Sequence, residues 1–208
     1  MVKSSMDTVI SGGGLSRSQS ERRQRILAAA TALASRGGYE AVQMRDVAER
    51  ADVALGTLYR YFPSKVHLLV TLMHEQTGQL TTRLDRRPPR GETAAERVVE
   101  VLSRATRALQ RDPQLADAMI RALMFADASA AAEVNAVNSI MTEAIIQSIR
   151  GTNGNHGSDD EHRAVARVLE QVWWANILAW LSGRSSTRQM TDDLNVAARL
   201  LLPAGRTS

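Results

Sequence analysis

Aromatic and cationic side chains are concentrated in one short stretch, VALGTLYRYFPSK, which runs from Val53 to Lys65. The chain has three tryptophans, three tyrosines and two phenylalanines, and Tyr59, Tyr61 and Phe62 lie within four positions. A tyrosine can place its ring against a sugar or a thymine methyl group and its hydroxyl on a phosphate, and lysine adds charge to the same contacts. The alternative is that some of these rings belong to a packed core. The stretch therefore carries residues suited to nucleic-acid binding, to core packing, or to both.

The charge distribution gives the first of these interpretations some weight. Residues 1–65 contain ten Lys and Arg against six Asp and Glu, whereas residues 66–208 contain sixteen of each. The whole net charge of +4 therefore lies in the first third of the chain. This is the pattern expected if that part meets a polyanion, although a basic tail without a partner has the same composition.

Residues typical of catalysis form no recognised pattern. His67, His74, His156 and His162 lack metal-ligand spacing, and the HEQTG segment has Gly78 where a second histidine is needed. No phosphate-binding Gly-Lys-Ser/Thr loop and no G-x-S-x-G elbow occurs. The absence of cysteine excludes disulfides and thiolate sites and is compatible with the cytoplasm. We expect no enzyme activity, no metal and no cofactor.

The elements that position the aromatic stretch are helices. The spacing of apolar residues predicts an all-α fold of about nine helices and no sheet. We expect a flexible tail over 1–17, a helix-turn-helix head over 18–65 and a larger helical domain over 66–204. No apolar run reaches the roughly 18 residues that a membrane span requires, so we expect no membrane partner. Predicted helix starts are Ser64, Asp112-Pro113 and the capping boxes Ser18/Glu21, Ser158/Glu161 and Ser186/Gln189.

Two short helices, about 44–51 and 54–61, form the predicted helix-turn-helix. Ala48, Ala51 and Leu58 are spaced to pack against the helix that precedes them. Asp52 occupies the turn, where a left-handed backbone is often required and aspartate tolerates it. Gly56 is left on the outer rim, at a cost of about 1 kcal/mol relative to alanine in a helix. Such a cost is reasonable where DNA must come close.

The segment AVQMRDVAERADVALGTLYRYFPSKVHLL resembles the DNA-binding signature of the TetR family of transcriptional regulators, with the specific match over about Tyr39 to Leu69. Two residues depart from the common pattern, because Gln43 stands where threonine is frequent and Asp52 where glycine is frequent. The resemblance implies a homodimer that binds a palindromic operator in double-stranded DNA.

The resemblance also implies a set of DNA contacts. Arg45 is the expected base-reading residue, with Gln43 as a cap or phosphate contact. Leu55, Gly56 and Thr57 would face the major groove. Leu58 and Phe62 are expected in the core. The full set of expected DNA-binding residues is Gln43, Met44, Arg45, Leu55, Gly56, Thr57, Tyr59, Arg60, Tyr61 and Lys65.

Four segments, two of which overlap the one above, look like one subgroup of that family, the ketosteroid regulators that repress bacterial cholesterol-catabolism genes: GGYEAVQMR, ADVALGTLYRYFPSKVHLL, RALMFADASAAAEV and NILAWL. This likeness implies a hydrophobic inducer, a steroid-derived coenzyme A thioester, with Arg104, Arg107 or Arg121 near its phosphates. The alternatives are a dry core without an inducer or an unrelated hydrophobic ligand. The expected ligand-binding residues are Arg104, Met119, Leu123, Met124, Phe125, Met141, Ile145, Trp174 and Asn176.

The segment VWWANILAWL is apolar almost all round a helix and must be covered on all sides. One face would meet its own domain and the other a second copy, with the last helix beside it. The expected dimer-interface residues are Val172, Trp173, Ile177, Trp180, Leu181, Leu194, Ala198 and Leu201.

Overall fold

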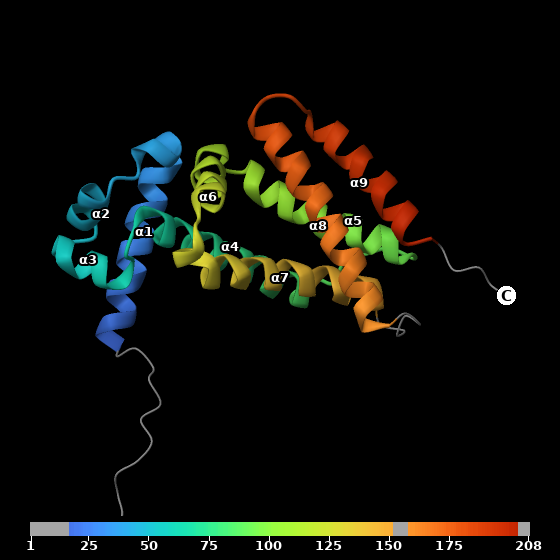
Figure 1. The fold of residues 1–208 in the computed structure, drawn as a ribbon, viewed down its shortest axis with the longest axis horizontal. Coiled ribbons are helices and arrows are strands. Elements are labelled where there is room, and N and C mark those ends of the chain that lie inside the picture. The colour runs from blue at the N-terminus through green and yellow to red at the C-terminus, as the bar shows by residue number, and fades with distance from the viewer. Residues whose placement is uncertain (1–16, 152–157, 204–208) are drawn as a thin grey trace, which may run out of the picture.

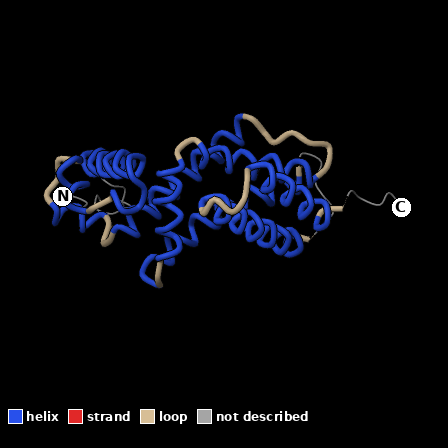
Figure 2. Tube along the Cα trace, turned by 90° about the horizontal axis from the view of Figure 1, so that it is seen from above, coloured by secondary structure: helices blue, strands red, loops and turns tan. Residues whose placement is uncertain are grey.

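The computed structural model describes residues 17–151 and 158–203, and within them every regular element is a helix, as predicted (Figure 2). The part of the expected tail before residue 17, and His156, lie outside the described residues. The elements are, in chain order, α1 (Arg17–Ala41), α2 (Met44–Arg50), α3 (Leu55–Tyr61), α4 (Lys65–Arg86), α5 (Ala94–Gln110), α6 (Pro113–Phe125), the single-turn 3-10 helix η1 (Ala128–Ala130), α7 (Ala131–Arg150), α8 (Asp159–Leu181) and α9 (Thr187–Leu201).

The helices form a small head and a larger body. Figure 1 shows α1, α2 and α3 gathered at one end, α5, α8 and α9 toward the other, and α4 and α7 running between them. α4 packs against α1 on the head side and against α5, α6 and α7 in the body. Buried apolar side chains form one continuous cluster from Ile26 in α1 to Ala198 in α9. The head is therefore joined to the body in two ways, through α4, which contacts both parts, and through the contact of α1 with α6.

Local sequence signals fix most helix starts. The hydroxyls of Ser64, Ser158 and Ser186 each accept a hydrogen bond from the backbone N–H three residues later, and Asp112 caps α6 in the same way. These four caps are confirmed. The predicted box at Ser18 is wrong, because α1 already includes Arg17 and Ser18 lies inside the helix.

A break in α1 sets the contact between head and body. Gly37 and Gly38 depart from helical geometry, and Gly38 has a φ of 66° in the left-handed region. A Cβ on Gly38 would lie 2.8 Å from a carboxylate oxygen of Asp117 in α6. The helix after this break carries Tyr39, whose ring lies 5.4 Å from that of Phe125, centroid to centroid. The head is thus docked on α6 through a close, glycine-dependent approach.

No helix in the described part of the chain combines the length and apolar character needed to cross a membrane.

Candidate DNA interface and ligand cavity

The head has an apolar core that fixes α3 in place. Leu58 is fully buried and Phe62 is nearly so, packed with Val47 and Ala48 of α2 against α1. Asp52 adopts a φ of 53°, the left-handed turn conformation predicted for it. The assignment of Leu58 and Phe62 to the core is therefore confirmed. The remaining side chains of α3 have to face outward or lie at the edge of this core.

The outer face of α2 and α3 carries the residues that the sequence assigned to DNA. Gln43, Arg45, Gly56, Tyr59 and Arg60 are exposed, whereas four others are half-buried: Met44, Leu55, Thr57 and Tyr61. The Tyr61 side chain packs against the core, and its hydroxyl lies 3.5 Å from the carbonyl oxygen of Gln19. The geometry brings these residues together on one accessible surface, and the contacts themselves stay predictions.

Gln43 and Lys65, two members of the set, also bind backbone carbonyl groups of the protein. Gln43 precedes α2 but its side chain does not cap the helix, because Nε2 donates to the carbonyl of Glu40 at 2.9 Å. Lys65 Nζ donates to the carbonyl of Tyr39 at 3.0 Å and lies 3.8 Å from the centroid of that ring. Burial lowers the pKa of Lys65, with the Glu40 charge opposing the shift. A phosphate would therefore compete with Tyr39 for this ammonium group.

Gly56 offers a direct test of close DNA approach, with Gly78 as its matched control. A Cβ built on either helical glycine meets no atom within 4 Å, so neither position needs glycine for packing. Alanine at each should raise the free energy of unfolding by about 1 kcal/mol. We expect Gly56→Ala to weaken operator binding about tenfold, a loss near 1.4 kcal/mol, and Gly78→Ala to leave it unchanged. Equal operator affinities in a titration of labelled DNA would contradict a close approach at Gly56.

A small cavity lies between α4, α5, α6, α7 and α8 and opens to the surface at the exposed Arg83. Its volume is about 60 Å³, and its lining includes Met73, Leu80, Met119, Met141 and Trp173. Pockets that hold drug-sized ligands have volumes of roughly 300–1,000 Å³. A large apolar ligand would have to separate these helices, which the flexible methionine side chains would assist.

Most of the expected ligand-binding residues do not line this cavity. Of the nine, Met119 and Met141 line the cavity and Arg104 lies at the surface of α5. Met124 and Phe125 are 64% and 59% exposed, because α6 ends there and turns them outward. Four other members do not line the cavity: Leu123, Ile145, Trp174 and Asn176. The ligand expectation is corrected accordingly for Met124 and Phe125, which face away from the interior.

Two of these residues have structural roles. Asn176 is buried and donates to the carbonyl of Val172 at 3.1 Å, so its amide is satisfied within α8. Ile145 of α7 is fully buried in the hydrophobic core. Both therefore support the packing of the body.

The α8–α9 face also differs from expectation. Trp173, Ile177, Leu194 and Ala198 are at most 2% exposed within a single protomer. They cannot offer surface to a second copy, so their assignment to a dimer interface is wrong. The other four are half-buried: Val172, Trp180, Leu181 and Leu201. The exposed apolar side chains of these helices are instead Val168, Val196 and Leu200, at 47%, 49% and 76%.

Comparison with known families covers both parts of this structure. Residues 26–72 match the family described as "Bacterial regulatory proteins, tetR family", and residues 91–201 match "Tetracyclin repressor-like, C-terminal domain". The chain belongs to the TetR family. The first match includes α2, α3 and the start of α4, and the second runs from the start of α5 to the end of α9.

Within the TetR family, the chain resembles proteins named HTH-type transcriptional repressor KstR. It is 52% identical to the one from Rhodococcus jostii (strain RHA1) over 190 residues, or 91% of this chain and 87% of that protein. It is 48% identical to the one from Mycobacterium tuberculosis (strain H37Rv) over 187 residues, covering 90% and 83% of the two chains. These values support its place in the KstR subgroup.

Solved TetR-family structures share the fold. A TetR transcriptional regulator from Rhodococcus sp. RHA1 superposes with a TM-score of 0.81 at 35% identity, over 90% of this chain and 98% of that one. Thermus thermophilus FadR, a repressor in complex with lauroyl-CoA, superposes with a TM-score of 0.71 at 22% identity, over 89% and 98%. At 22% identity, the likeness to FadR shows that the two proteins share a fold.

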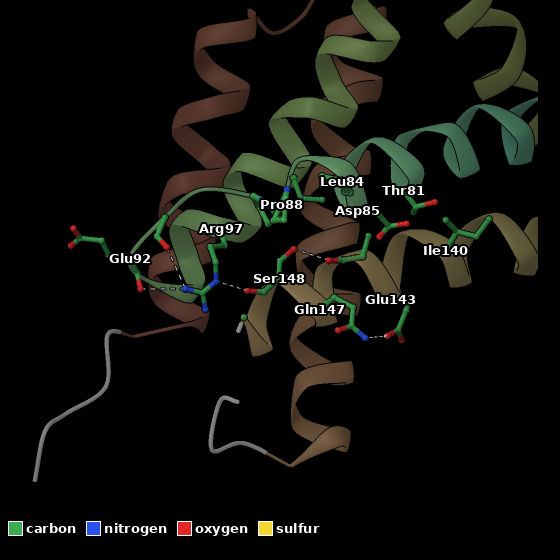
Figure 3. Close-up of a pocket in the computed structure, with 15 residues that line it drawn as sticks. Thr81, Leu84, Asp85, Pro88, Glu92, Arg97, Ile140, Glu143, Gln147 and Ser148 are labelled. Carbon is green, nitrogen blue, oxygen red and sulfur yellow. Dashed lines mark hydrogen bonds between the residues drawn. The ribbon is translucent and has the colours of Figure 1, made fainter. Parts of the chain in front are cut away.

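A second hollow of this TetR-family protein is a groove that the sequence did not indicate. It measures about 1060 Å³ and lies between the end of α4, the loop before α5, and α7 (Figure 3). Three carboxylates line it, from Asp85, Glu92 and Glu143. Its arginine, Arg97, donates to the carbonyl groups of Ser148 and Ile149 at 2.9 and 3.2 Å. The groove is therefore acidic, because three carboxylates outnumber its one guanidinium group.

Proposed function

We propose that this chain is a cytoplasmic, homodimeric transcriptional repressor that binds a palindromic operator through α2 and α3. The observation that carries the proposal is the outer face of the head, where Arg45 and Tyr59 are exposed beside the open position at Gly56. Arg45 would read a base in the major groove, and the neighbouring side chains would contact phosphates. Operator affinity should fall steeply with salt, because these contacts release counterions.

The exchange of Arg45 for alanine tests this interface, with Arg50 as control. Both arginines are exposed on α2, at its second and last residues, and neither has a carboxylate partner within 4.0 Å among the described residues. Arg45→Ala should cost about 1–3 kcal/mol and relax base preference at one position of each half-site. Arg50→Ala should change neither by a comparable amount. The operator is obtained by selection from random duplexes, and unaltered specificity in Arg45→Ala would contradict base readout by this residue.

We further propose that the repressor controls sterol or steroid catabolism genes and is released from DNA by a steroid-derived coenzyme A thioester. The similarity to KstR repressors over about nine-tenths of the chain supports the class of genes. A protein of the same fold binding lauroyl-CoA supports an acyl thioester as ligand.

The release mechanism would be a shift between two populations of the dimer. α4 starts beside the head at Lys65, and its residues Leu80 and Arg83 reach the small cavity. Eighteen residues of helix place Arg83 about 27 Å from the start of α4. A ligand that separates α4 from its neighbours would tilt the heads away from the spacing of about 34 Å that one DNA turn requires.

One observation favours a second candidate, a regulator of the same fold without this inducer or with an unrelated hydrophobic ligand. The cavity of about 60 Å³ is too small for a steroid unless the helices move. Thermal unfolding with cholanoyl-CoA, stearoyl-CoA and coenzyme A separates the candidates. A ligand at about 100 times its Kd should stabilise the protein by about 2.7 kcal/mol. Stabilisation by neither thioester would favour the second candidate.

A further inference from the structure

The ammonium group of Lys65 is already occupied where the head meets the body. Lys65 is the first residue of α4, and the resemblance to TetR regulators assigns its side chain to a DNA phosphate. The ammonium group donates to the carbonyl of Tyr39 at 3.0 Å and lies 3.8 Å from the centroid of the Tyr39 ring. The second of these geometries is that of a cation–π contact. One residue at the end of α1 therefore holds a group that is expected to bind DNA.

α6 of the body fixes Tyr39 from two sides. The Tyr39 ring lies 5.4 Å from the ring of Phe125, centroid to centroid, at an interplanar angle of 57°. The backbone N–H of Tyr39 donates to one carboxylate oxygen of Asp117 at 3.4 Å, and Arg121 donates to the other at 2.8 Å. The helix break at Gly38 allows this close approach of α1 to α6. The position of Tyr39 is thus set by the docking of the head on α6.

The first turn of α4 is also held, so the side chain of Lys65 is the part that can move. Ser64 caps the helix by accepting a hydrogen bond from the backbone N–H of His67. His67 is buried, and its Nε2 lies 3.1 Å from the carbonyl oxygen of Ser129 in η1. Lysine carries its ammonium group on a flexible four-carbon stem. The ammonium group can therefore leave Tyr39 while the backbone of α4 stays in place.

The contact with Tyr39 and a contact with phosphate exclude each other for this group. When the ammonium group turns toward a phosphate, it gives up the ring and the carbonyl of Tyr39. A contact made only in the free protein lowers the apparent affinity, because only the remaining fraction of molecules is competent to bind. Removing that contact should therefore strengthen operator binding. Removal of a residue with a purely structural role would weaken it.

We propose that Tyr39 sets the operator affinity of the head by withholding the Lys65 ammonium group from phosphate. This role rests on the proposed function, which is operator binding through α2 and α3. Tyr39 is a positioning residue in this scheme, and Phe125 and Asp117 of α6 position it in turn. The packing of the head against the body is thereby linked to one phosphate contact of the DNA interface.

Three substitutions separate the Tyr39 ring from the fold of the head. Tyr39→Leu removes the ring and keeps the backbone carbonyl, Tyr39→Phe keeps both, and Lys65→Gln removes the ammonium group. These variants and the double variant Tyr39→Leu/Lys65→Gln would be titrated against the selected operator at one salt concentration. Thermal unfolding of each variant measures whether the head and body remain folded.

Tyr39→Leu should bind the operator about four- to twenty-fivefold more tightly than the wild type. Each of the two heads gains about two- to fivefold from the loss of one cation–π contact at a partly exposed site. Tyr39→Phe should bind like the wild type. In the Lys65→Gln background, Tyr39→Leu should bring no gain, because no ammonium group is released. Equal or weaker binding by Tyr39→Leu with an unchanged unfolding midpoint, or the same gain without Lys65, would overturn the proposal.

Proton chemical shifts test the contact in the wild-type protein and do not depend on how the variants fold. The ε-methylene protons of Lys65 are next to Nζ, so the Tyr39 ring current should move their resonance upfield in the free protein. Lys65→Gln assigns the resonance by its loss. We expect the upfield shift to disappear in the operator complex. A shift that persists in the complex would show that Lys65 stays on Tyr39, and the proposal would be wrong.

Failure of this role and failure of the proposed function give different results. If selection yields no duplex that the wild type binds specifically, the proposed function is wrong and the role of Tyr39 is lost with it. If the operator is bound and the ring-current shift persists in the complex, operator binding stands and only the role of Tyr39 is wrong.

Discussion

Replacing Val168 and Leu200 together by glutamate should convert the dimer to a monomer and lower operator affinity about a thousandfold, to near the non-specific level. The two side chains are 47% and 76% exposed in the protomer, on the outer surfaces of α8 and α9. A second copy would cover them, and a glutamate buried there without a partner would be strongly unfavourable. A single head has only one half-site to hold, which accounts for the size of the loss.

Light scattering coupled to size exclusion measures the mass, and a DNA titration measures the affinity. Met124→Glu is the control, because Met124 is 64% exposed on α6, outside the α8–α9 face. That variant should remain dimeric and bind the operator normally. A double variant that keeps the mass of a dimer would place the interface on another surface.

Replacing Trp173 by alanine should lower the free energy of unfolding by about 3–5 kcal/mol. The indole is 1% exposed, and its Nε1 donates to Thr106 Oγ1 at 2.9 Å, which joins α8 to α5. Removing it leaves a large cavity and a buried hydroxyl without this partner. Trp174, the next residue, is half-buried beside it with the ring centroids 4.9 Å apart.

Trp174→Ala is the matched control and should cost clearly less. Denaturant unfolding at one fixed protein concentration measures both, because the stability of a dimer depends on concentration. If Trp173→Ala dissociates the dimer while the protomer keeps its stability, the tryptophan belongs to the interface after all. Equal losses for the two variants would contradict the burial that the structure assigns to Trp173.

The helices and the head could be predicted because their signals are local. Ser64, Asp112, Ser158 and Ser186 cap their helices through their own side chains, and Asp52 takes the left-handed turn that its position required. Ser18 failed because a serine followed by Glu21 has the same pattern inside a helix as at its start. Glu21 instead pairs with Arg17, at 3.2 Å.

For a helix that is apolar all round, the local sequence could not predict which side chains face the core of the protomer and which face a second copy. The apolar pattern of α8 does not distinguish a neighbour in the same protomer from a second copy, so Trp173 and Ile177 were placed in the interface instead of the core. The ligand cavity depended on where α6 ends, because Met124 and Phe125 follow the apolar spacing but turn outward there. Non-local packing decides both cases.

The arginines at the end of α4 and on α5 lie between these two cases. The spacing of Arg104, Arg107 and Arg111 on one helix is visible in the sequence, and the first two are among the phosphate contacts that the resemblance implies. Arg121, the third of those contacts, pairs with Asp117 at 2.8 Å and does not line the surface hollow around Arg104. The position of Arg83 of α4 at the same hollow depends on how α4 and α5 pack, which the sequence alone does not indicate.

The most direct test of the account is release of the wild-type protein from its selected operator by cholanoyl-CoA, followed by fluorescence anisotropy of the labelled DNA. We predict complete release, half-maximal at a concentration at least about tenfold below that needed with free cholanic acid, because the acid lacks the phosphate groups that can form charge-assisted hydrogen bonds. Operator binding that persists unchanged in cholanoyl-CoA, at concentrations that saturate its thermal stabilisation of the protein, would contradict the account.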